Sequence, residues 1–312
     1  MEQFNASTLQ GFILLGFRVG QQGRLLLLIS FTMVYIFTLI ENLVIILVVS
    51  EDAQLSRLPM YILLSNFSWL EVCYVSATVP RMLFDLSFPG GVISFHACFI
   101  QFYVFFSLGT TECFFLSAMA LDRYLAICCP LRYTQIMSKK FCFLLVTLCW
   151  IIGFLCYIAP ASLISKLSFC GPNAIDHYIC DSGGLLALAC HPPESLSLFC
   201  YVTSSTLILG TFLFIMISYV GIIFTLAKKS GENTGKKGFQ TVSSHLAVVT
   251  IFYGSVATMY IGYTEKNRTE NIKVMTLFYS AVAPLLNPLI YCLRNNQVKG
   301  ALSRVLRKKG VI

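Results

Sequence analysis

Seven long apolar segments determine what this chain can fold into. They cover roughly residues 25–50, 58–82, 95–128, 141–163, 196–227, 239–262 and 274–293. About 20 predominantly apolar residues are enough for one helix to cross the hydrocarbon core of a bilayer. Charged residues make up only 12% of the chain, roughly half the share found in soluble domains. The sequence therefore predicts an all-α fold, a bundle of seven transmembrane helices.

Basic residues are distributed unevenly between the two sides of this predicted bundle. Fifteen Lys and Arg residues fall on the side of the C-terminus and seven on the side of the N-terminus. Because cytoplasmic connections are enriched in Lys and Arg, residues 1–24 are expected to be extracellular. The net charge of +8 then reflects membrane orientation, and no nucleic-acid partner is expected. Asn5, in the sequon Asn5-Ala6-Ser7, is an expected glycosylation site, whereas Asn267 in a second outer sequon stays open.

No repeat or linker divides the chain, so residues 1–312 are read as one domain. Residues 164–195 form its long second extracellular loop, and residues 294–312 its cytoplasmic tail. Within the tail, apolar residues at helical spacing alternate with basic ones, a pattern typical of a helix lying on anionic membrane lipid. A solvated basic tail is the alternative. The apolar stripe consists of Val298, Ala301, Leu302, Val305 and Leu306.

Three acidic residues, Glu41, Glu71 and Glu112, fall inside the predicted spans. An ionisable group at that depth costs several kcal/mol, so it is expected to face the bundle interior and to have polar partners. Asn42, Glu71, Glu112 and Asn287 are the predicted intramembrane polar cluster, and Glu71 and Glu112 are also a candidate sodium site. A protonated acid that is hydrogen-bonded for packing alone is the alternative.

Two short motifs lie at positions where a helix could change its contacts. Asp122-Arg123-Tyr124 closes the third span at its cytoplasmic end, where Arg123 could pair with Asp122 in one state and with another partner in a second. Asn287-Pro288 lies deep in the seventh span, where the proline removes a backbone donor and allows the helix to flex.

These motifs and several others occur in the order and spacing of a known family. They are Pro59-Met60-Tyr61, the stretch 119–131 (MALDRYLAICCPL), Ser218-Tyr219, residues 236–246 (KKGFQTVSSHL), Phe252-Tyr253-Gly254 and residues 284–295 (PLLNPLIYCLRN). With them the chain resembles the odorant receptors among the rhodopsin-like G protein-coupled receptors, along nearly its whole length. The resemblance implies a plasma-membrane receptor for a small volatile odorant. It also implies coupling to a stimulatory olfactory G protein that raises cyclic AMP, without enzymatic activity or a cofactor.

The resemblance also assigns roles to particular residues. It implies the disulfides Cys98–Cys180 and Cys170–Cys190, whereas spacing alone leaves the pairing of these four cysteines open. The residues expected to switch and to couple to the G protein are Asp122, Arg123, Tyr124, Tyr219, His245, Asn287, Pro288 and Tyr291.

A ligand pocket is expected in the outer half of the bundle. Third-span residues 102–110 lie roughly 20 to 30 Å from Arg123 at ~1.5 Å per residue, and their helical spacing can place one face on a cavity. Phe105 stands where amine receptors carry an Asp, so we expect a small, neutral, mostly apolar ligand. Thr110, Ser204 or Tyr260 would donate its hydrogen bonds. The predicted lining residues are Phe102, Phe105, Phe106, Gly109, Thr110, Thr203, Ser204, Leu207, Val256 and Tyr260.

Other classes of membrane protein fit the sequence less well. A transporter or channel often shows paired halves with interrupted helices, and this chain shows no repeat. An intramembrane enzyme needs a nucleophile, a base or metal ligands that converge, and His96, His177 and His191 lie near no such set. A purely structural protein has no need of intramembrane acids. The receptor reading is therefore preferred.

Overall fold

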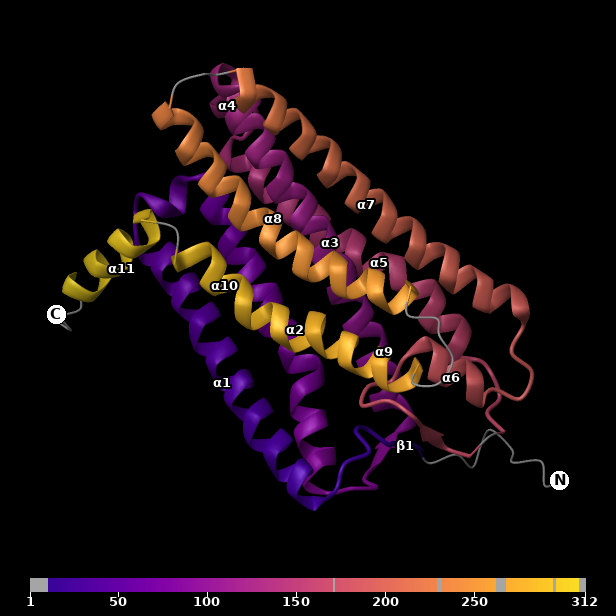
Figure 1. Ribbon diagram of the computed structural model, residues 1–312. Helices are drawn as coiled ribbons and strands as arrows, with labels where there is room; N and C mark the ends of the chain where they lie inside the picture. Colours follow the sequence, from indigo (N-terminus) through magenta and orange to yellow (C-terminus); the bar gives the residue numbers. More distant parts are fainter. Residues whose placement is uncertain (1–10, 171, 229–231, 262–267, 294–295, 309–312) are drawn as a thin grey trace.

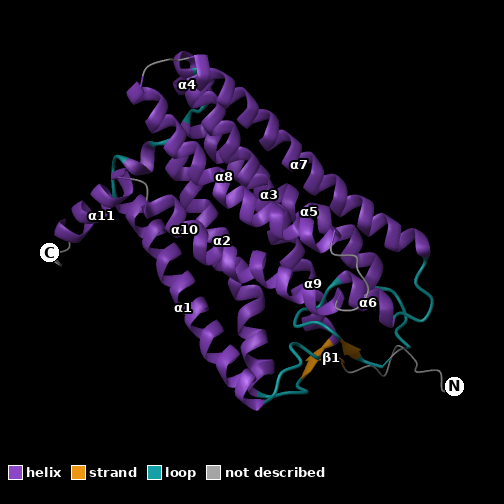
Figure 2. Ribbon diagram, in the orientation of Figure 1, coloured by secondary structure: helices purple, strands orange, loops and turns teal. Residues whose placement is uncertain are grey.

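The computed structural model describes residues 11–170, 172–228, 232–261, 268–293 and 296–308, with the backbone alone for 232–241, 259–261, 268, 291–293 and 296. Long helices run side by side as a bundle (Figures 1 and 2). One end of the bundle holds the strands and α6, and the other end holds α4 and α11 (Figure 1). The elements of the bundle are α1 (Gln21–Glu51), α2 (Pro59–Ser87), α3 (Phe95–Cys128), α5 (Lys139–Ser165), α7 (Glu194–Lys228), α8 (Glu232–Ile261), α9 (Arg268–Leu277), η2 (Phe278–Val282) and α10 (Ala283–Leu293).

Six of the described helical stretches are long and apolar enough to cross a membrane, and a shorter apolar stretch, Val242–Thr258, lies in α8. Large apolar side chains point outward from these helices, among them Leu26 at 66% exposed and Ile217 at 71% exposed. Exposure of such an apolar surface to water is unfavourable, whereas lipid tails are as apolar as these side chains. The expected bundle of seven apolar helices is therefore confirmed.

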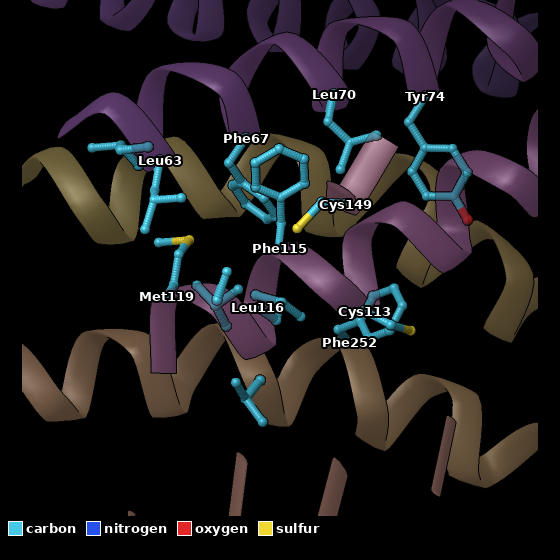
Figure 3. Packing of buried hydrophobic residues seen from close by; sticks show 14 of the residues in the cluster. Leu63, Phe67, Leu70, Tyr74, Cys113, Phe115, Leu116, Met119, Cys149 and Phe252 are labelled. Atoms are coloured by element: carbon cyan, nitrogen blue, oxygen red, sulfur yellow. The ribbon is translucent and has the colours of Figure 1, made fainter. Parts of the chain in front are cut away.

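The core lies around α3, which packs against α2, α5 and α7. Phe115 of α3 faces Phe67 of α2, with ring centroids 6.3 Å apart, and Cys149 of α5 lies beside them (Figure 3). Serine side chains cap the N-termini of α3 and α5. Ser94 and Ser138 each accept a hydrogen bond from the backbone N–H three residues later, at 3.3 Å. Pro59 occupies the first turn of α2. The backbone N–H groups of a first turn have no partner within the helix, so the N–H that proline lacks costs no hydrogen bond.

A small sheet caps one end of the bundle, which the all-α expectation did not include. Strand β1 (Gly11–Leu14) pairs antiparallel with β2 (Val92–Ser94) and parallel with β3 (Ala174–Ile175). Both expected disulfides are present at this end, which we call the disulfide end. The Cα atoms of Cys98 and Cys180 are 5.6 Å apart, and those of Cys170 and Cys190 are 4.9 Å apart. The short helix α6 (Ser182–Leu188) lies between Cys180 and Cys190 in the sequence.

The seventh span differs from the single continuous helix that hydropathy predicted. It begins at Arg268, before the expected residue 274, and its middle, Phe278–Val282, is π-helical. Pro284 lies two residues after this stretch, and its ring nitrogen cannot donate to the preceding turn, which favours a wider turn at this point. Pro288 lies inside α10, four residues further on.

The opposite end carries Arg123 at the last turns of α3, and we call it the Arg123 end. Here the short helix α4 (Pro130–Ile136) follows α3, and η1 (Leu55–Arg57) precedes α2. The amphipathic helix α11 (Asn296–Lys308) packs against α1 and α10. Its apolar stripe is buried at Val298 and Ala301.

Ionic and polar contacts fasten α11 to this end of the bundle. Arg304 Nη2 lies 2.7 Å from Asp52 Oδ2, and Tyr61 donates to Gln297 Oε1 at 2.7 Å. Asp52 also accepts the backbone N–H groups of Gln54 and Leu55, each at 3.0 Å. The pKa of Asp52 is held below its usual value by these hydrogen bonds and by Arg304, against the opposing effect of burial.

Candidate functional site

A cavity of about 570 Å³ opens among α3, α7, α8 and the seventh span at the disulfide end. Seven of the ten predicted pocket residues line it: Phe105, Phe106, Gly109, Thr110, Ser204, Leu207 and Val256. Phe102 packs instead among the buried residues around Cys98, and Thr203 is not among the lining residues. The side chain of Tyr260 lies outside the described residues. The cavity volume lies within the range of small-molecule sites.

Two of the three hydroxyl groups expected to hold a ligand, those of Thr110 and Ser204, already have partners inside the protein. Thr110 Oγ1 donates to the carbonyl oxygen of Phe106 at 2.9 Å, within its own helix. Ser204 Oγ shares a hydrogen bond with the hydroxyl of Tyr157 at 2.9 Å. Phe106 stacks on the ring of Tyr157 with centroids 5.3 Å apart, which fixes that tyrosine against the cavity wall. A ligand would therefore meet these hydroxyls mainly as acceptors.

His177 supplies a polar group that the sequence analysis did not assign to the pocket. It lines the cavity, is 5% exposed, and accepts the backbone N–H of Ile179 at Nδ1 over 3.2 Å. Burial, together with the positive charge of Lys273, lowers the pKa of His177 to about 3. The ring is thus neutral, and with Nδ1 accepting a hydrogen bond its proton is on Nε2. The only sequence signal was its position three residues before Cys180.

An ion cluster around the buried Lys273 holds the loop segment beside His177 in place. The ammonium of Lys273, fully buried, lies 2.7 Å from Asp176 Oδ1 and 2.8 Å from Glu270 Oε1. Arg18 binds the other oxygen of Asp176 at 2.7 Å. The N-terminal segment, the loop and α9 therefore meet at one carboxylate.

Asp181 is the one carboxyl group among the described residues that line this cavity. Its oxygens accept the backbone N–H groups of Gly183 at 3.0 Å and of Gly184 at 3.2 and 3.3 Å, and so cap α6. Burial is the largest effect on its pKa and raises it, against those hydrogen bonds. The carboxyl group of Asp181 therefore binds the backbone of its own loop and does not offer a free charge to a ligand.

The Arg123 end holds three of the eight predicted switch residues, Asp122, Arg123 and Tyr124. Asp122 accepts the hydroxyl of Tyr133 at 2.8 Å, and Arg123 Nη2 contacts Met60 Sδ of α2, so the two do not form the pair that their adjacency suggested. The ring of Tyr124 lies against Gly221 of α7.

The remaining switch residues lie deeper in the bundle. A hydrogen bond between the Tyr219 hydroxyl and His245 Nδ1 joins α7 to α8. Asn287 and Pro288 lie in α10, and the side chain of Tyr291 is outside the described residues.

The predicted polar cluster is buried at the centre of the bundle. Asn287 Nδ2 donates to Glu71 Oε1 at 2.5 Å, and Glu112 lies close enough to Glu71 for their carboxyl groups to interact. Asn42 donates to the carbonyl oxygens of Thr38 at 2.9 Å and of Pro284 at 3.3 Å, and so joins α1 to the seventh span. Glu41 Oε2 is buried as well and has no hydrogen-bond partner among the described residues.

Several buried oxygens of this cluster lack a hydrogen bond within the described part of the chain. They are Asn42 Oδ1, Glu71 Oε2, Glu112 Oε1 and Oε2, and Asn287 Oδ1. Buried polar atoms normally have partners. This set could be satisfied by protonation, by water or by a cation, although the described residues hold no group of three or more His, Cys, Asp or Glu side chains arranged for a metal.

A seven-helix bundle with a small-molecule cavity at one end and a basic helix terminus at the other defines a class of membrane receptors. The fold is shared with squid rhodopsin, whose crystal structure matches with a TM-score of 0.73 at 16% identity, over 93% of this chain and 84% of that one. A family model described as olfactory receptor matches residues 31–309. The human proteins named olfactory receptor 11H6 and 11G2 are 52% and 49% identical, over 95% and 96% of this chain and 89% and 87% of their own lengths. The chain belongs to the olfactory receptor family and is an odorant receptor of the G protein-coupled class.

Proposed function

We propose that this receptor binds a small, neutral, largely apolar odorant in the cavity at the disulfide end. The observation that carries the proposal is the lining itself, which is mostly aromatic and aliphatic and contains no uncommitted charge among the described residues. Burial of apolar surface at ~25 cal/mol per Å² would supply most of the binding free energy. For a molecule of odorant size this corresponds to modest, micromolar affinity.

The polar contact in this site is assigned to His177. Its Nε2–H is a neutral donor in the cavity wall, so it favours an oxygen acceptor on the ligand, as in a ketone, aldehyde, ester or alcohol. A carboxylate would lose its hydration without gaining a positive partner, because His177 stays uncharged at physiological pH. Thr110, Ser204 and Tyr260 remain further candidates for a second hydrogen bond.

We propose that the disulfide end faces the outside of the plasma membrane and the Arg123 end the cytoplasm. Disulfides persist in oxidising compartments, which supports this orientation. The G protein would bind at the Arg123 end, where Leu131 on α4 is 93% exposed and α4 buries none of its side chains. An apolar side chain left in water beside Arg123 is a natural contact for a partner protein. We assign that partner as the stimulatory olfactory G protein, which raises cyclic AMP.

The polar cluster would connect the two ends. Asn42, Glu71, Glu112 and Asn287 link α1, α2, α3 and α10, and their buried oxygens can gain or lose a proton or a sodium ion. Two nearby carboxyl groups in a low dielectric cannot both be charged without such a partner. A change in occupancy would favour one arrangement of the seventh span over another.

A cyclic-AMP assay in cells that express the receptor, with a panel of odorants, tests the proposal. A Cβ at Gly109 would lie 3.0 Å from the hydroxyl of Tyr74 in the cavity floor, so Gly109→Ala should reduce sensitivity to the best odorant and Gly109→Leu should abolish it. Gly210→Ala, where nothing lies within 4 Å, is the matched control. A best odorant with a permanent charge, or full sensitivity in Gly109→Leu at normal surface expression, would contradict the proposed site.

A further inference from the structure

A second cavity of about 520 Å³ lies at the disulfide end, between the N-terminal segment and the outer ends of α1 and α2. It shares no lining residue with the odorant cavity. The loop segment 177–179 separates the two, because Tyr178 lines this cavity whereas His177 and Ile179 line the other. The proposed function makes no use of this second cavity.

The walls of the second cavity are mainly apolar. Tyr178 lies at its inner side, where Phe17 stacks on it with ring centroids 5.4 Å apart and an interplanar angle of 18°. Leu15 and Val19 line it while remaining 44% and 42% exposed, although both precede the first membrane helix. Apolar side chains left exposed around a hollow mark a site that an apolar group can cover.

One positive charge in this cavity is left unbalanced. The lining includes three charged residues, of which Arg18 is paired with Asp176 and Asp85 with Arg81, at 2.7 Å in each case. Arg24 is half-buried and forms no ion pair within the part of the chain that the structure describes. A half-buried guanidinium beside apolar walls favours an anion that brings its own hydrocarbon.

The first turn of α1 adds to this preference. Its N-cap is Gly20, which offers no side-chain acceptor, and the turn contains no acidic residue. The free N–H groups and the helix dipole therefore favour negative charge on the same side as Arg24.

We infer that this cavity is a second ligand site, which takes an amphiphilic anion, an acidic head group on a hydrocarbon chain or ring. Arg24 binds the head group, and the hydrocarbon lies against Phe17, Met82 and Leu86. The same chemistry is offered by a free carboxylic acid and by an anionic phospholipid of the outer leaflet.

The test uses the purified full-length receptor in nanodiscs of uncharged phosphatidylcholine, with equilibrium binding of radiolabelled decanoate and of decanol, corrected with empty nanodiscs. Decanoate should bind the native receptor, and Arg24→Gln should weaken that binding roughly tenfold while leaving decanol unchanged. Arg18→Gln is the matched control, since Arg18 lines the same cavity but is already paired with Asp176, and its effect should be smaller.

Two cavity-filling variants locate the bound molecule. Leu86→Trp should reduce binding of both probes, whereas Val256→Trp, in the odorant cavity, should leave decanoate binding intact. Decanoate binding that is unchanged in Arg24→Gln, or that is lost in Val256→Trp, would overturn the inference. Because Arg24 is only half-buried, Arg24→Gln keeps the test decisive even if Leu86→Trp fails to fold. None of these readouts depends on odorant signalling, so the proposed function can fail separately.

Native mass spectrometry separates the two sources of the ligand. If the anion is a lipid, receptor taken from nanodiscs with phosphatidylglycerol should retain that lipid, lose it in Arg24→Gln and release it to decanoate. If the anion is a free acid, decanoate should bind without any retained lipid. Retained phosphatidylglycerol that Arg24→Gln does not reduce and decanoate does not displace would count against the site.

Discussion

α3 and α5 are in close contact at Gly153, and this contact gives a prediction whose size follows from the geometry. A Cβ on residue 153 would lie 2.0 Å from Thr111 Oγ1 and 3.0 Å from both the Cα and the Cβ of that residue. Thr111 is fully buried and its hydroxyl is bonded to the carbonyl oxygen of Ser107 at 2.8 Å, so it has no room to turn away. Gly153→Ala therefore has to push the two helices apart.

Two opposing effects decide the stability of Gly153→Ala. Alanine in a helix interior is favoured over glycine by ~1 kcal/mol. Overpacking of a filled core costs ~1–3 kcal/mol, and contact with backbone as well as side chain places this site at the upper end. We therefore expect a net loss of about 2 kcal/mol, which lowers the unfolding temperature by roughly 4 °C for a chain of this size.

A thiol-reactive dye measures the effect in purified receptor, because Cys113, Cys142 and Cys149 are buried and free. They become reactive only when the bundle opens. Gly210→Ala is the control: the site is exposed on α7 with nothing within 4 Å, so the variant should match or exceed the native unfolding temperature. Equal unfolding temperatures for Gly153→Ala and Gly210→Ala would refute the packing argument.

Three further predictions concern the site and the switch. Arg123→Ala should keep surface expression within a few-fold and abolish the cyclic-AMP response, and a surface-expressed variant that signals normally would disprove the role of Arg123. Glu112→Gln should change basal cyclic AMP or odorant potency more than expression; if sodium and Gln variants of Glu71 and Glu112 leave signalling untouched, the cluster only packs. His177 has a pKa of about 3 in the fold against 6.5 when exposed, so its contribution to stability is full above pH 6.5 and is lost as the pH falls toward 3. His177→Gln should therefore flatten the loss of thermal stability between pH 7.5 and 5, and an unchanged slope would refute the assignment.

The helices could be predicted because hydropathy acts on every residue of a span. The span 95–128 coincides with α3. The other described helices begin and end within a few residues of the expected limits, apart from the end of α2, the start of α8 and the early start at Arg268. The small sheet could not be predicted, since two to four residues carry no readable period. The π-helical turn at Phe278–Val282 is equally local, and the flexible point that the sequence predicted in this span was Pro288 instead.

The lining residues that could be predicted from the sequence all lie on membrane helices. Phe105, Phe106, Gly109 and Thr110 share a face of α3, so their spacing placed them together on the cavity. His177 belongs to an irregular loop whose course depends on Cys180 and on the ion pairs of Lys273 with Asp176 and Glu270. Contacts of that kind join distant parts of the chain, and spacing in one sequence does not indicate them.

The segment 177–179 has a consequence for how binding could diversify among related chains. Consecutive side chains of this loop segment line different cavities, Tyr178 one of them and His177 and Ile179 the other. A substitution at Tyr178 would reshape one hollow while leaving the other nearly untouched, and a substitution at His177 or Ile179 would do the reverse. Insertion of a single residue would shift both sets at once, and the disulfide between Cys98 and Cys180 would hold one end of the segment in place. Point mutations within this short segment can therefore alter each cavity separately, whereas a change in the length of the segment would disturb both cavities.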